Sequence, residues 1–158
     1  MDSRQVIGLF EMFERHSFRA WAAGGWAVDA LVGRQTRDHG DLDLAVDATQ
    51  LERLMCVLEE EGFSLIVDWL PSRAELRSAD GRVIDLHPVR FAPDGTGVQA
   101  GFGDQSFPYA ADGFTLGSIE GTPIPCLSAG QQLAFRIGYP LRPVDHHDFE
   151  LLHAIAHA

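Results

Sequence analysis

The residues best suited to chemistry are two aspartates, Asp41 and Asp43, in the stretch GDLDLAV. If residues 41–46 form a strand, both carboxylates project to one face, while Leu42 and Leu44 point to the core. Two like charges held that close repel each other unless a cation lies between them. Mg²⁺ prefers oxygen ligands and commonly binds together with nucleotide phosphates. The spacing therefore predicts a magnesium–nucleotide site.

A third carboxylate, Asp85, lies in the stretch RVIDLHP. On a strand it would share a face with His87, while Ile84 and Leu86 would point the opposite way. A lone aspartate in an apolar strand is costly to bury without a partner. If this strand neighbours the first one, Asp85 completes a three-carboxylate cluster. His87 then either contacts the site or is a strand-end histidine with its own partners.

A glycine pair, Gly24-Gly25, comes before Trp26 and a short apolar segment that ends at Gly33. Glycine lets the backbone approach a ligand closely. A helix N-terminus adds free N–H donors and a dipole that favours anions. We expect a turn followed by a helix, in which the backbone N–H groups of Gly24, Gly25 and Trp26 position phosphates.

Two cationic side chains, Arg37 and His39, lie between the glycine pair and the first carboxylates. They either contact phosphate or orient the carboxylates, and an ion pair with Asp41 or Asp29 is an equally good interpretation. Asp29 itself is expected to be a structural hydrogen-bonding partner within the predicted helix.

Three further residues are candidates for contacts with an acceptor substrate. Arg73 and Glu75 either line the pocket or form a buried ion pair with each other. Tyr109 either walls an apolar part of the pocket or packs in the core. It lies in a stretch, residues 91–114, that is rich in glycine, aspartate and proline and predicts a long loop or irregular hairpins.

The elements that must position these residues follow from periodicity and turn signals. Helices are expected at 4–16, 49–62, 128–136 and 145–157, strands at 18–22, 41–46, 63–69, 74–77 and 82–88, and a hairpin at 116–124. This pattern predicts an α+β protein, a small mixed sheet flanked by helices with a C-terminal helical segment. Residues 1–90 would form the core, and residues 91–158 would pack on it.

Composition limits the function. The chain has 158 residues, 46% of them hydrophobic, and a net charge of −11. That charge argues against nucleic-acid binding, which needs a basic face. The sequence has no run of eighteen apolar residues, so no membrane-spanning helix is expected, and the acidic, amphipathic opening is not typical of a signal peptide. Its two cysteines have no pairing pattern, so we expect a cytoplasmic protein.

These motifs together resemble the small antibiotic nucleotidyltransferases of the polymerase-beta-like superfamily. The stretch GGWAVDALVGRQTRDHGDLDL is similar to the signature shared by lincosamide and aminoglycoside 2″-nucleotidyltransferases. The later stretches WLPSRAEL, IDLHP, IPCLS and GYPLRPVDHHDF resemble the short lincosamide enzymes. The resemblance covers nearly the whole chain and departs around residues 95–112.

The resemblance implies the polymerase-beta-like nucleotidyltransferase fold and the transfer of a nucleoside monophosphate to a drug hydroxyl, with release of pyrophosphate. Asp41 and Asp43 would bind Mg²⁺, and Asp85 would bind a second metal ion or act as general base. The co-substrate would be a nucleoside triphosphate, ATP before others, and the acceptor a lincosamide such as lincomycin or clindamycin.

Other functions stay open from the sequence. An aminoglycoside acceptor is the nearest alternative, and a nucleotidyltransferase that modifies a protein partner or a natural metabolite is a second. Related enzymes often pair, so a homodimer is also expected.

Overall fold

The computed structural model describes residues 1–138 and 140–158. Tyr139, part of the GYPLRPVDHHDF match, lies outside the described residues. The helices are α1 (Ser3–Arg15), α2 (Gly24–Val32), the 3₁₀ turn η1 (Ala48–Gln50), α3 (Leu51–Glu60), α4 (Ala129–Phe135) and α5 (Pro143–Ala156). The strands are β1 (Ala20–Ala22), β2 (Leu42–Asp47), β3 (Phe63–Trp69), β4 (Arg73–Ser78), β5 (Val83–Phe91), β6 (Gly97–Ala100), β7 (Ser106–Tyr109), β8 (Phe114–Ile119) and β9 (Thr122–Leu127).

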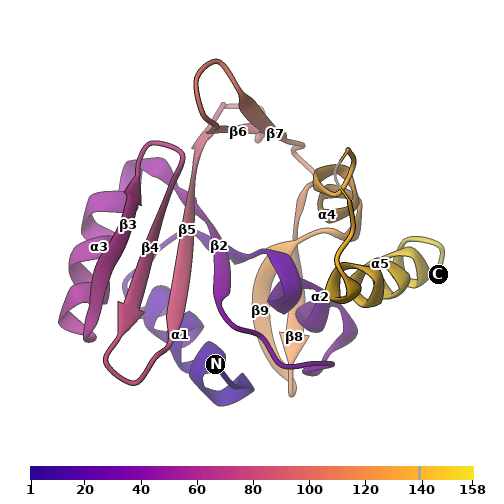
Figure 1. Ribbon diagram of the computed structural model, residues 1–158, viewed down its shortest axis with the longest axis horizontal. Coiled ribbons are helices and arrows are strands. Elements are labelled where there is room, and N and C mark those ends of the chain that lie inside the picture. Colours follow the sequence, from indigo (N-terminus) through magenta and orange to yellow (C-terminus); the bar gives the residue numbers. More distant parts are fainter. Residues whose placement is uncertain (139) are drawn as a thin grey trace.

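Strands from the N-terminal and C-terminal halves of the chain form one mixed sheet, in the order β3-β4-β5-β2-β1-β9-β8. β2 pairs with β5 in parallel, and β1 pairs with β9 in parallel, whereas the other pairs on this path are antiparallel. Figure 1 shows the β6–β7 hairpin rising from the end of β5, with α4 and α5 on the far side of β9. The predicted α+β fold with a mixed sheet and a C-terminal helical segment is confirmed. The division at residue 90 stays a prediction.

The core lies on the sheet face opposite the aspartates. Leu42, Leu44, Ile84 and Leu86 are fully buried, in one cluster with apolar side chains of α1 and α3. Their alternation with Asp43 and Asp85 follows the two-residue period of a strand. The core thus fixes the side of the sheet on which the carboxylates stand.

Two local expectations from the sequence need correction. The strand expected at residues 41–46 is β2, which begins at Leu42, so Asp41 lies just before it. The last helix begins at Pro143 after Arg142, and Asp145 lies in its first turn, where its carboxylate accepts from the Arg142 backbone N–H. Strand β3 is an edge strand with a bulge between Leu65 and Val67, so its apolar residues do not alternate cleanly into the core.

Helix α2, which carries the glycine pair, is held against β8. It ends at Gly33 in the left-handed conformation, which glycine adopts without strain. Gly117 of β8 lies so close to α2 that a side chain there would collide with the backbone carbonyl of Ala30. Among the described residues no helix is both long and apolar enough to cross a membrane.

We predict that Gly117→Ala lowers the free energy of unfolding by about 1–3 kcal/mol, the usual cost of overpacking. The collision is with backbone, so α2 or β8 must shift. The matched control is Gly8→Ala in the interior of α1, where an added methyl group meets nothing within 4 Å. There the change should stabilise by about 0.5–1 kcal/mol. Urea unfolding measures both, and an unchanged midpoint in Gly117→Ala would refute the close packing.

Candidate active site

Two buried or half-buried carboxylates meet across the parallel strands at the centre of the sheet. Asp43 on β2 is the register partner of Asp85 on β5, and both side chains project away from the core. Asp85 is only 7% exposed, whereas Asp43 is half-buried. Asp41 lies just before the same strand, is more exposed, and faces the same cleft.

Arg73 clamps the buried carboxylate of Asp85. Its Nε donates to Asp85 Oδ1 at 3.0 Å, and its Nη2 lies 2.9 Å from Asp85 Oδ2. The same Nη2 lies 2.9 Å from Glu75 Oε2. Burial raises the pKa of Asp85 above its ordinary value, although the charges of His87 and Arg73 oppose the rise. Arg73 and Glu75 therefore form an ion pair with each other, and both line the cleft.

The pKa of Asp41 is raised as well. Desolvation is the largest cause of a raised pKa at this residue, and the charges of Asp43, Asp85 and Glu75 add to it. Mutual repulsion of this kind favours either a proton or a cation at the site.

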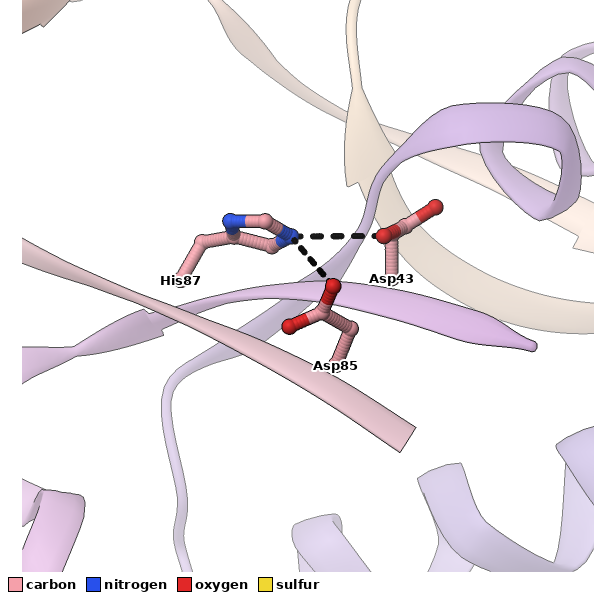
Figure 2. A group of neighbouring side chains, drawn as sticks. All are labelled: Asp43, Asp85 and His87. Atoms are coloured by element: carbon pink, nitrogen blue, oxygen red, sulfur yellow. Dashed lines mark hydrogen bonds and ion pairs between the residues drawn. The ribbon is translucent and has the colours of Figure 1, made fainter. Parts of the chain in front are cut away.

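His87 faces both central carboxylates with Nε2 of its ring (Figure 2). Its Nε2 lies 3.3 Å from Asp43 Oδ1 and 3.8 Å from Asp85 Oδ2. Burial disfavours the charged imidazole, but the hydrogen bond and charge of Asp43, with Asp85, raise the pKa of His87 overall. The prediction that His87 shares a face with Asp85 is confirmed.

The glycine turn lies directly against these groups. A side chain at Gly24 would collide with Asp43 Oδ2, and one at Gly25 would collide with the side chains of His39 and Arg37. Both positions therefore need glycine for close approach. Trp26 is 1% exposed, with its indole tilted against the imidazole of His39, so its backbone, not its ring, is what could meet a ligand.

His39 pairs with Asp29, one of the two partners that the sequence offered. His39 Nε2 lies 2.5 Å from Asp29 Oδ2, and both side chains are buried. Asp29 also accepts from the backbone N–H and the hydroxyl of Thr36. Asp29 is thus a structural hydrogen-bonding partner that fixes the loop after α2.

Arg37 has a partner that the sequence analysis missed. Asp148 of α5 accepts two hydrogen bonds from Arg37, from Nε at 2.9 Å and from Nη2 at 2.8 Å. Asp148 is 2% exposed and also lies 3.4 Å from Arg136 Nη2. The hydrogen bond to Asp148 raises the pKa of Arg37. The two residues are 111 positions apart, so only the resemblance of GYPLRPVDHHDF to relatives singled out the segment.

Most of these groups line a cleft of about 1010 Å³, among them Asp43, His87 and Arg37, whereas Asp85, Asp29 and Trp26 are not part of its lining. Its lining includes the carboxylates of Asp41, Asp43 and Glu75 and the guanidinium groups of Arg37 and Arg136. The β6–β7 hairpin contributes the exposed aromatic rings of Phe102 and Phe107 together with the buried side chains of Tyr109 and Gln99. The expected irregular hairpins in residues 91–114 thus form a wall of the cleft.

The donor set fits a divalent cation. Ligand atoms of Asp43, Asp85 and His87 all lie within 4.8 Å of one another. Carboxylate oxygens are the ligands that Mg²⁺ prefers, and the repulsion described above is relieved by a positive charge. Asp41 lies beside this group, outside that 4.8 Å set.

Comparison with known proteins places the chain in a family. The aminoglycoside-2″-adenylyltransferase family profile matches residues 5–152. The lincosamide resistance protein of Staphylococcus haemolyticus is 34% identical over 152 residues, which cover 96% of this chain and 94% of that protein. The 2″-aminoglycoside nucleotidyltransferase of Escherichia coli is 28% identical over 131 residues, covering 81% of this chain and 70% of that protein.

A solved structure supports the same assignment. The lincosamide antibiotic adenylyltransferase LnuA with lincomycin bound has a TM-score of 0.89 and 33% sequence identity, covering 98% of both chains. The resemblance inferred from the motifs is therefore confirmed. The chain belongs to the aminoglycoside-2″-adenylyltransferase family and is an enzyme of the nucleotidyltransferase type.

Proposed function

We propose that this enzyme transfers AMP from ATP to a hydroxyl group of a lincosamide antibiotic and so confers resistance. The acceptor oxygen forms a bond to the α-phosphorus, the bond from that phosphorus to the bridging oxygen of the β-phosphate breaks, and pyrophosphate leaves. The hydroxyl proton passes to a base on the protein. Each bond formed is thus balanced by one broken.

One observation carries the choice of acceptor. The similarity to LnuA covers 98% of both chains at 33% identity, whereas the Escherichia coli aminoglycoside enzyme matches at 28% and over 70% of its length. An aminoglycoside is the second candidate, because the cleft wall of Asp41, Asp43 and Glu75 also suits a polycationic sugar. Modification of a protein or a natural metabolite ranks below both.

Asp41 and Asp43 are proposed to hold Mg²⁺, which would neutralise phosphate charge during transfer. Asp85 is proposed as the general base, although the resemblance also allows a ligand role. Its carboxylate is buried, its pKa is raised, and the Arg73 clamp holds it in one orientation. A base whose pKa lies nearer to neutral accepts a proton more effectively.

The triphosphate is proposed to bind at the glycine turn. Backbone N–H groups of Gly24, Gly25 and Trp26 begin helix α2, where the helix dipole favours an anion. Arg37 lies against Gly25, while His39, buried and paired with Asp29, supports the turn. All twelve basic residues of the chain are arginines, so phosphate charge must be met by guanidinium groups, backbone and metal.

The acceptor is proposed to lie between the acidic wall and the β6–β7 hairpin. Arg73, Glu75, His87 and Tyr109, the four candidates from the sequence, all line the same cleft. The rings of Phe102 and Phe107 on the hairpin would add an apolar surface for the alkyl-proline part of a lincosamide. Cytoplasmic localisation is proposed because ATP is available there, and a homodimer stays part of the proposal.

The substrate assignment predicts that incubation with ATP and Mg²⁺ adds one AMP to lincomycin and clindamycin and none to kanamycin. Mass spectrometry of the drugs gives the answer, and parallel reactions with GTP, CTP and UTP identify the nucleotide. An adduct on kanamycin alone would keep the chemistry and overturn the acceptor. No adduct on any drug would favour a protein or metabolite as acceptor.

The metal assignment predicts that Asp43→Asn lowers kcat by at least about 100-fold, the scale on which positioned electrostatic groups act. The charge that holds Mg²⁺ is lost while the shape of the side chain is kept. Glu59→Gln, on the exposed face of α3, is the control and should retain full activity. Full activity in Asp43→Asn, with an unchanged melting temperature in both variants, would refute the assignment.

The base assignment predicts a change in the pH profile of kcat/KM when the clamp is removed. Arg73 stabilises the charged form of Asp85, so Arg73→Met should raise the pKa of Asp85 further. Activity that needs the carboxylate is lost as pH falls through that pKa, and the acid limb should therefore move to higher pH. Arg82→Met, which removes an arginine paired with Asp80, should leave the limb in place. A limb that stays unmoved in Arg73→Met would exclude Asp85 as the base.

A further inference from the structure

A buried glutamine, Gln99 of β6, touches the imidazole that faces both carboxylates. Its side chain is enclosed, with the residue 7% exposed. Gln99 Nε2 donates to the backbone carbonyl of Ser72 at 3.0 Å and lies 3.1 Å from His87 Nδ1. Gln99 Oε1 accepts from the hydroxyl of Tyr109 at 2.8 Å. Every polar atom of this amide therefore has a partner.

The amide of Gln99 has only one orientation that satisfies all three neighbours. The Ser72 carbonyl can only accept a hydrogen bond, so the NH₂ group must face it. In the flipped orientation two oxygens would face each other, and a buried acceptor would be left unsatisfied. Tyr109 either donates or accepts, so it adapts to the orientation that Ser72 sets.

This orientation decides the role of His87. The second N–H of the amide points to Nδ1 of the ring, so Nδ1 must be the acceptor. In a neutral imidazole one nitrogen accepts and the other carries the proton. The proton therefore lies on Nε2, the atom that faces Asp43 at 3.3 Å (Figure 2).

We propose that Gln99 is a positioning residue that holds the neutral ring of His87 as the Nε2–H tautomer, so that His87 donates to Asp43 instead of binding a cation. The ligand atoms of Asp43, Asp85 and His87 are close enough to hold a metal ion. Binding through Nε2 would need its lone pair and would move the proton to Nδ1, against the N–H of Gln99. The cation is then left to carboxylate oxygens, which suit Mg²⁺.

The consequence for catalysis rests on the proposed function. His87 holds Asp43 from the Oδ1 side, and the Gly24 turn packs against Oδ2. Gln99 touches neither Asp43 nor the glycine turn that is proposed to bind phosphate, so it acts only through the ring of His87. Outer residues that orient a metal ligand typically change activity or metal affinity by about 10–100-fold when they are lost.

The test locates the ring proton directly in the metal-free full-length protein. With ¹⁵N-labelled histidine, two-bond ¹⁵N–¹H correlation spectra, recorded at rising pH until the ring ¹⁵N shifts stop changing, distinguish the two tautomers of the neutral ring. His87→Gln identifies the signals of His87 among those of the seven histidines. We expect Nε2–H in the unmodified protein. A proton on Nδ1 would overturn the proposal, whatever the drug or nucleotide turns out to be.

A matched pair of variants tests whether Gln99 is the cause. Gln99→Glu replaces the donor by an acceptor of nearly the same shape, so Nδ1 should gain a proton and kcat should fall by about 10–100-fold. Gln105→Glu makes the same change at an exposed position in the turn of the hairpin and should alter neither. If Gln99→Glu folds and Nδ1 still carries no proton, Gln99 does not set the tautomer. If it does not fold, the spectrum of the unmodified protein decides.

Discussion

Repulsion between two carboxylates on neighbouring parallel strands is the constraint on which the site depends. Asp43 and Asp85 are register partners, and their strands cannot separate because the opposite face is the packed core. Nearby charges have to balance this arrangement: Arg73 clamps Asp85, and His87 reaches Asp43. A divalent cation would complete the balance, so the proposed metal–nucleotide site would follow from how the sheet is packed.

The position of Arg37 in the cleft depends on a buried carboxylate outside the central pair of aspartates. Asp148 of α5 holds Arg37 through two hydrogen bonds and also lies beside Arg136. Removing one partner of a buried pair is costly because the other charge is left unpaired. The C-terminal helices thus do more than cover the sheet, because Asp148 of α5 fixes the direction in which the guanidinium group of Arg37, in the loop after α2, can point. An arginine suits this role, since its planar fork binds a carboxylate in two places at once.

Sequence patterns predict the features that a single strand or turn determines, and they fail where a contact joins residues far apart in the sequence. The alternation around Asp43 and Asp85 was sufficient to place both on one face, because the strand period is strict. The partner of Arg37 could not be found this way, since no periodicity links residues 111 positions apart. Gln99 was missed for another reason: in a glycine-rich segment nothing marks one polar residue as buried. Asp29 was identified as structural, and its pairing with His39 supports that prediction.

The hairpin β6–β7 shows how one small element can serve two parts of a reaction. Side chains alternate along β6, so Gln99 turns inward while Val98 turns outward. On β7, Phe107 and Tyr109 share the face of Gln99, and Tyr109 is buried whereas Phe107, the register partner of Gln99, stays exposed at the cleft. The buried pair Gln99 and Tyr109 is tied to His87 and so to the carboxylates, and the exposed rings face the space proposed for the acceptor. The acceptor surface of the hairpin could therefore vary between relatives without disturbing the inner contacts, provided that the strand register is kept. This separation gives a physical reason why one nucleotidyl-transfer site can serve acceptors as different as a lincosamide and an aminoglycoside.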